Sequence, residues 1–135
     1  MFTKEQLEGI LLSLPKPEIH VSRDDRLRTG YKVRLRLNFR GSSDFLLGLK
    51  RNFAQYNIET QYKEEEHKAR PLPILRVSGA TNIYSTIQLV PDLPDAKGNW
   101  EPFKDVFSLY ENGQHLTQEG LERILEIKGV IWWDF

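Results

Sequence analysis

Alternating basic side chains are the residues of this sequence best suited to bind another molecule. Between positions 31 and 40 every second residue carries a hydrogen-bond donor, namely Lys32, Arg34, Arg36, Asn38 and Arg40. Arginine and lysine bind phosphate oxygens and guanine edges, and asparagine matches the edge of adenine. The set therefore has the chemistry of a surface for a polyanion. A charged face that only keeps the protein soluble would give the same pattern.

The charge distribution also indicates a local polyanion surface. The 135 residues have a net charge of zero, but residues 16–40 hold eight bases and three acids, and the rest of the chain is net acidic. One strongly basic segment in a neutral protein is typical of a localised binding surface. A solvated basic hairpin is the alternative reading.

The sequence offers few residues for metal or covalent chemistry. Cysteine is absent, which excludes a disulfide framework and a cysteine-based zinc site. No second histidine or carboxylate stands at ligand spacing from His20, so we expect His20 to lie on a surface or in a groove. The acids of the basic segment are Glu18, Asp24 and Asp25.

A long amphipathic strand must position the basic set. Tyr31, Val33, Leu35, Leu37 and Phe39 alternate with the polar residues, which predicts one packed and one solvated sheet face. The same reading predicts helices over 3–14, 44–56, 82–89, 101–111 and 117–128, and strands over 18–23, 31–40, 58–63 and 74–78. We expect a single α+β domain over residues 1–135. Its order is αββαββα with appended helices, which an antiparallel four-stranded sheet with the helices on one face satisfies.

Two short segments resemble a known protein family. Residues 7–15, LEGILLSLP, lie on the first helix, where LAGLIDADG homing endonucleases carry their motif. Residues 115–127, HLTQEGLERILEI, look like the C-terminal HLT-x-EGL-x-x-I pattern of that family, and Trp100 and Phe103 look like its entry to the last helix pair. The resemblance covers essentially the whole chain. It implies the αββαββα module, which places the open face of its sheet in the major groove of DNA.

The sequence departs from this family at its catalytic position. The position of the metal-binding aspartate is Leu14, and the neighbouring motif positions are Leu12 and Pro15. Leucine offers no oxygen ligand, and hard cations require oxygen ligands. The resemblance therefore implies no catalytic residue, no metal site and no cofactor. Magnesium would be needed only if Glu18, Asp24 or Asp25 replaced the lost acid, which the strand register does not favour.

The resemblance also implies which residues contact DNA and a second copy of the chain. Besides the basic set of residues 31–40, the DNA-contacting positions are His20, Ser22, Gln61, Lys63, Arg76 and Lys97. The motif helices of paired modules pack together, which implies a homodimer interface at Leu7, Gly9, Ile10, Leu11 and Leu14. A small residue such as Gly9 would let the two helices approach closely.

These observations predict a sequence-specific, homodimeric protein that binds double-stranded DNA and has lost nuclease activity. One alternative is an active metal-dependent endonuclease with a displaced acid, and another is a protein-interaction module that kept only the fold.

No apolar run approaches the roughly 20 residues of a membrane helix, and the start lacks the basic region of a signal peptide. We therefore expect a cytoplasmic, nucleoid-associated protein.

Overall fold

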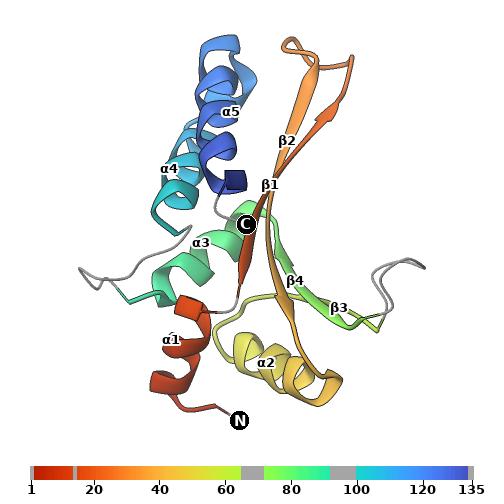
Figure 1. The fold of residues 1–135 in the computed structure, drawn as a ribbon, viewed down its shortest axis with the longest axis vertical. Helices are drawn as coiled ribbons and strands as arrows, with labels where there is room; N and C mark the ends of the chain where they lie inside the picture. Colours follow the sequence, from red (N-terminus) through yellow and green to blue (C-terminus); the bar gives the residue numbers. More distant parts are fainter. Residues whose placement is uncertain (1, 14, 65–71, 92–99, 134–135) are drawn as a thin grey trace. The chain divides into compact units, whose positions relative to one another are not determined.

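The computed structural model describes residues 2–13, 15–64, 72–91 and 100–133, with the backbone alone at 16 and 130–133. Its elements are α1 (Lys4–Ser13), β1 (Lys16–Arg23), β2 (Tyr31–Arg40), α2 (Ser43–Gln55), β3 (Gln61–Lys63), β4 (Ile74–Ser78), α3 (Ala80–Leu89), α4 (Trp100–Glu111), the 3-10 helix η1 (Gln114–Leu116) and α5 (Gln118–Trp133) (Figure 1). The predicted order αββαββα with appended helices is confirmed. Of the described helices, none is long and apolar enough to cross a membrane.

The four strands form one sheet in the order β1-β2-β4-β3. Strand β4 pairs antiparallel with β2 on one side and with β3 on the other. Arg36 lies opposite Ser78 and Asn38 opposite Arg76, while Gln61 lies opposite Arg76 from the other side. The predicted antiparallel four-stranded sheet is therefore confirmed, and its register fixes which outward side chains are neighbours.

The chain divides into two compact units. Unit 1 comprises Met1–Glu18 and Arg36–Ala96, and unit 2 comprises Ile19–Leu35 and Lys97–Phe135. Strands β1 and β2 each contribute one end to either unit. The buried residues of β2 consequently belong to two cores. Val33 and Leu35 lie in the core of unit 2, and Leu37 and Phe39 lie in the core of unit 1.

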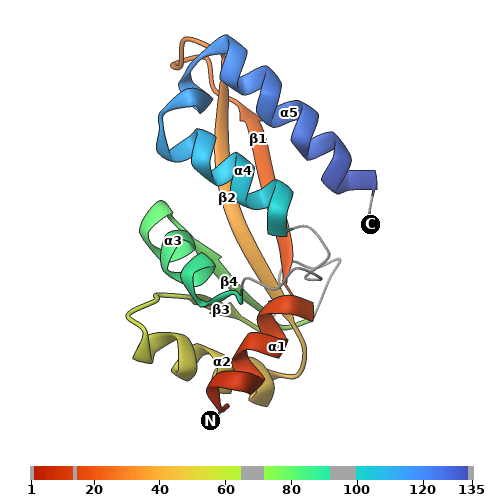
Figure 2. The same cartoon turned by 90° about the vertical axis from the view of Figure 1, so that its left-hand side faces the viewer.

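The core of unit 1 lies between β2, β4 and three helices. Leu37 and Phe39 on β2 are fully buried, as is Phe53 on α2. The rings of Phe39 and Phe53 meet edge-on with centroids 5.5 Å apart. Helices α1, α2 and α3 lie on the near side of these strands in Figure 2. Helix α2 begins where Ser42 accepts a hydrogen bond from the Phe45 amide, so the Gly-Ser-Ser turn ends β2 and caps the helix that covers it.

The core of unit 2 lies between the other ends of the same strands and the helices α4 and α5 (Figure 2). Ile19, Val33 and Leu35 are buried on the strands. The helices contribute the buried residues Trp100, Phe103, Val106, Phe107, Leu121, Ile124 and Ile127. The two helices predicted over 101–111 and 117–128 are therefore present, and both bury apolar side chains.

Several sequence predictions need correction. Helix α3 begins at Ala80 instead of residue 82, and α5 continues to Trp133 instead of ending at residue 128. Strand β3 begins at Gln61 instead of residue 58, because the backbone of residues 58–60 is bonded elsewhere: Ile58 donates to the Phe53 carbonyl, and Glu59 donates to the Asn82 side chain. Tyr31 was expected in the packed set but is 45 % exposed. Tyr31 is the first residue of β2, directly after the turn of residues 24–30, and it lies beyond the end of the buried core.

Candidate nucleic-acid interface

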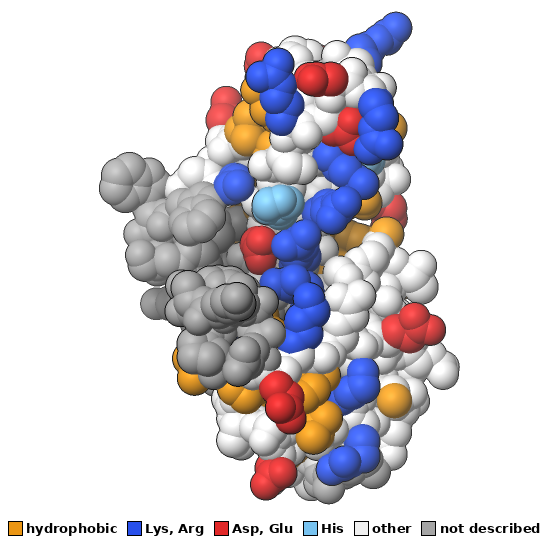
Figure 3. Space-filling model, turned by 90° about the vertical axis from the view of Figure 1, so that its right-hand side faces the viewer, with side chains coloured by type: hydrophobic (Ala, Val, Ile, Leu, Met, Phe, Trp, Pro, Cys, Tyr) orange, Lys and Arg blue, Asp and Glu red, His pale blue; other side chains and the backbone are white. Residues whose placement is uncertain are grey.

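The solvated face of the sheet in unit 1 carries a polar row that crosses all four strands. Asn38 and Arg76 are register partners, Gln61 is the next partner beyond Arg76, and Glu18 on β1 is hydrogen-bonded to Asn38. Blue lysine and arginine side chains gather on this face in the view of Figure 3. The sheet therefore places residues from separate parts of the sequence in one line.

Hydrogen bonds connect three members of this row. The Asn38 amide nitrogen donates to Glu18 Oε2 over 2.7 Å, and Arg76 Nε donates to the Asn38 amide oxygen over 2.8 Å. Arg36 Nη1 lies 3.5 Å from Glu18 Oε1 in a partly buried ion pair. We call Glu18, Arg36, Asn38 and Arg76 the polar cluster. It includes two arginines, one carboxylate and one amide.

Asn38 does not meet the expectation of an open groove residue. It is only 8 % exposed, and both ends of its amide are hydrogen-bonded inside the polar cluster. Reading an adenine edge would require both of these hydrogen bonds to break. The sequence pattern correctly placed Asn38 on the solvated face but could not show that its neighbours cover it.

The other unit 1 residues of this face are more accessible. Gln61 and Lys63 are exposed on β3, Arg40 is half-buried, and the register puts Lys63 and Arg40 in the same row, on either side of Ile74. The sequence prediction that Gln61, Lys63 and Arg76 share the outward face is therefore consistent with the strand pairing. These residues present amide and cationic donors beside the polar cluster.

Unit 2 carries the remaining strand residues that sequence analysis singled out. Arg34 is exposed and Lys32 half-buried on β2, alternating with the buried Val33 and Leu35. His20 and Ser22 on β1 are half-buried. The alternation thus gives this end of β2 a solvated cationic face, as predicted.

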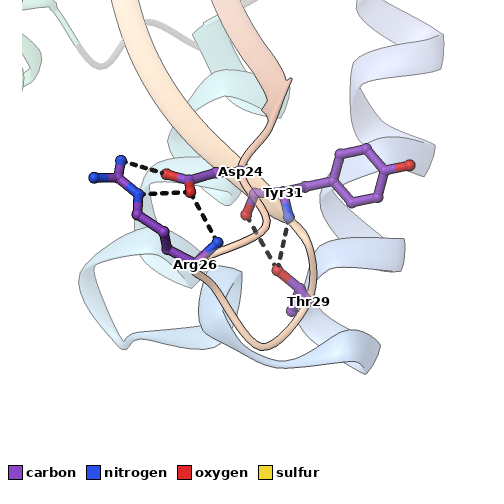
Figure 4. A network of polar contacts seen from close by, with 4 residues as sticks. All are labelled: Asp24, Arg26, Thr29 and Tyr31. Carbon is purple, nitrogen blue, oxygen red and sulfur yellow. Dashed lines mark hydrogen bonds and ion pairs between the residues drawn. The ribbon is translucent and has the colours of Figure 1, made fainter.

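The turn between β1 and β2 is held by its own ion pair (Figure 4). Asp24 accepts two side-chain hydrogen bonds from Arg26, both of 2.9 Å, and one from the Arg26 amide. The side-chain hydrogen bonds from Arg26 lower the pKa of Asp24 to about 2, which keeps the carboxylate charged at neutral pH. Thr29 closes the turn through hydrogen bonds with the Tyr31 backbone. Sequence analysis assigned this segment to neither a helix nor a strand.

Helix α1 divides the predicted dimer residues into two groups. Leu7 and Leu11 are 2 % and 0 % exposed, so they belong to the core of unit 1 and are not available to a partner. Gly9 is exposed and Ile10 half-buried, and a Cβ added at Gly9 would meet nothing within 4 Å. The predicted interface residue Leu14 and the predicted DNA-contacting residue Lys97 lie outside the described residues.

The acids near this face are already engaged by cations. Glu18 pairs with Arg36, Asp24 with Arg26, and Asp25 with Arg23. Within the described ranges, no three His, Asp or Glu side chains gather in a group able to hold a metal ion. The family's acid position is leucine in this sequence. The residues present therefore do not fit the magnesium site that the resemblance to active endonucleases implies.

Solved structures share this fold. The homing endonuclease I-TnaI has a TM-score of 0.77 and 20 % identity, over 94 % of this chain and 86 % of its own. The archaeal intron-encoded homing endonuclease I-Vdi141I, solved in complex with DNA, has a TM-score of 0.81 and 12 % identity, over 98 % and 83 %. The LAGLIDADG meganuclease I-CpaMI, solved bound to uncleaved DNA, has a TM-score of 0.77 and 18 % identity, over 95 % of this chain but only 45 % of its own.

No family model and no curated protein matches the sequence. The fold assignment therefore rests on the structural similarity, and it agrees with the two sequence segments that resemble the family's motifs. The chain has the fold of a LAGLIDADG homing endonuclease, present as one αββαββα module.

Proposed function

We propose that this protein binds double-stranded DNA sequence-specifically through the solvated face of its sheet, as a homodimer, and does not cleave it. The observation that carries the proposal is the cationic side chains on consecutive outward positions of β2, continued by Arg76 on β4 and Lys63 on β3. Like charges side by side on an open sheet oppose folding unless a counter-charge is bound. A bound polyanion would supply counter-charge beyond that which Glu18 gives to Arg36.

Two further observations support DNA as the polyanion. The neighbours I-Vdi141I and I-CpaMI share the fold and were solved with DNA. The candidate face also offers an exposed amide donor beside its cations, at Gln61. Cations alone bind any phosphate backbone, whereas amide and guanidinium groups together can distinguish base edges.

The test is a selection from a random duplex library, with and without magnesium, followed by affinity measurements on the selected duplex at several salt concentrations. We expect a pseudo-palindromic consensus, because a two-fold pair reads related half-sites. Affinity should fall steeply with salt, since phosphate contacts release counterions. A protein-interaction module would instead show no salt-dependent retention of duplex DNA, and that result would contradict the proposal.

Magnesium is expected to leave the bound target intact. A leucine stands at the position of the metal-binding acid, and Glu18, Asp24 and Asp25 are engaged by arginines. The thermal midpoint should also stay unchanged on adding magnesium, because an ion that binds the native state must raise it. Denaturing gels of the selected duplex, with and without chelator, measure cleavage. Specific double-strand breaks that the chelator abolishes would favour an active nuclease with a displaced acid.

The variant Gly9→Leu should weaken self-association about tenfold, as expected for a side chain forced into a close helix contact. Gly9 is the exposed small residue of α1, with Ser13 four residues later on the same face and hydrogen-bonded to the Gly9 carbonyl. Analytical ultracentrifugation measures the change. Gly129→Leu on α5 is the matched control, because a Cβ there also meets nothing within 4 Å. A wild-type monomer at micromolar concentration, with and without DNA, would exclude the homodimer.

A further inference from the structure

The polar cluster contains an acid at a place where DNA binding alone would favour none. We infer that Glu18 is a specificity-determining positioning residue, which fixes Arg36 and, through Asn38, Arg76 before DNA arrives. The inference rests on the proposed function and adds to it the means by which this face prefers one sequence over others.

The contacts of Glu18 reach arginines on two other strands. One carboxylate oxygen accepts the Asn38 amide over 2.7 Å, and the other pairs with Arg36 over 3.5 Å. The Asn38 oxygen then accepts Arg76 Nε over 2.8 Å. The Arg76 contact is made through Nε, and this hydrogen bond restrains the orientation of the guanidinium group.

The burial of these groups makes the arrangement persistent. The side chains of Arg36 and Glu18 are 19 % and 31 % exposed, and Asn38 is 8 % exposed. Partly buried ion pairs are screened less by solvent and salt than exposed ones. An arginine held in place before binding loses less conformational freedom when it meets a base edge.

The same acid must also reduce indiscriminate binding. On the proposed DNA-binding face its negative charge would repel phosphates, and it partly neutralises Arg36, which would otherwise bind any duplex. Specificity is a difference between affinities, and it increases when wrong partners are penalised. Glu18 thus lowers the affinity for duplexes of any sequence and raises the preference for the target sequence. An ion pair with only a structural role would not have both effects.

The experiment compares wild type with E18Q, N38A and the control E111Q. Glutamine keeps the shape of Glu18 but removes its charge, while E111Q removes the same charge from the exposed end of α4. Each protein is measured against the duplex selected by the wild type, single-base-pair variants of it, and poly(dI-dC). Circular dichroism and thermal unfolding establish that each variant is folded.

E18Q should bind poly(dI-dC) about tenfold more tightly, and its discrimination between the selected duplex and the variants should fall about tenfold, the range of one well-placed arginine–base contact. N38A carries no charge change. It should therefore lose discrimination only at the base pairs that depend on Arg76, with poly(dI-dC) affinity unchanged. E111Q should match the wild type in both measurements.

The outcomes separate the inference from the proposed function. Discrimination by E18Q and N38A equal to that of the wild type would overturn the inference alone. Weaker binding of E18Q to every duplex in proportion, with lower stability, would assign Glu18 a purely structural role and also overturn it. A wild type that selects no sequence would overturn the proposed function, and the inference with it.

Discussion

The double variant R34A/R36A is expected to bind the selected duplex about a hundredfold more weakly than the wild type, the combined effect of two arginine contacts. Arg34 is exposed on the solvated face of β2, and Arg36 is the next outward residue of the strand. Removing Arg36 also removes the ion pair between Arg36 and Glu18. The remaining carboxylate would then repel phosphates. We therefore expect the step from R34A to R34A/R36A to cost more DNA affinity than the loss of one exposed arginine alone.

The salt dependence tests whether these arginines contact phosphates. Each lost phosphate contact reduces the slope of log affinity against log salt by nearly one unit. The matched control is R51A/R123A, which removes two arginines from the exposed sides of α2 and α5 and changes the net charge equally. Fluorescence anisotropy at several salt concentrations measures both variants. An equal loss in the control would mean that overall charge, and not this face of β2, determines DNA binding.

Local sequence patterns predicted most of the fold because the spacing of apolar residues differs between helices and strands. The alternation along Tyr31–Arg40 predicted both bounds of β2 and, apart from Tyr31, its packed face. The helix predicted over residues 3–14 is present as α1, and its start is capped by reciprocal hydrogen bonds between Thr3 and Gln6. Thr117 accepts a hydrogen bond from the Gly120 amide, as expected at a helix start.

The candidate site was less predictable because its geometry depends on contacts between distant segments. No sequence period shows that Glu18 reaches Asn38, 20 residues away, or that Arg76 reaches it from the other side, 38 residues away. The same limit applies to α1. Its apolar stripe suits both a core and a partner helix, and only the packed structure shows that Leu7 and Leu11 are buried within the chain.

The substitution Gly120→Ala is expected to destabilise the protein by about 3 kcal/mol, at the upper end of the usual cost of overpacking. A Cβ at Gly120 would lie 2.0 Å from the carbonyl oxygen of Gln114 and 2.6 Å from its carbonyl carbon. The 3-10 helix η1 that contains Gln114 cannot easily move away. The His115 ring stacks on Tyr110 of α4 with centroids 4.1 Å apart, and Leu116 and Thr117 donate backbone hydrogen bonds within the same turn.

The control for this prediction is Gly129→Ala in the same helix α5. Its Cβ would meet nothing within 4 Å, and alanine favours a helix over glycine by about 1 kcal/mol. Gly129→Ala should therefore leave the protein as stable as the wild type or more stable, although it makes the same chemical change as Gly120→Ala. Urea unfolding followed by circular dichroism measures both. Equal urea midpoints for the two variants would contradict the prediction. They would mean that η1 moves to accommodate the new methyl group. The close approach of Gly120 to Gln114 would then not explain why the HLT-x-EGL segment has a glycine here.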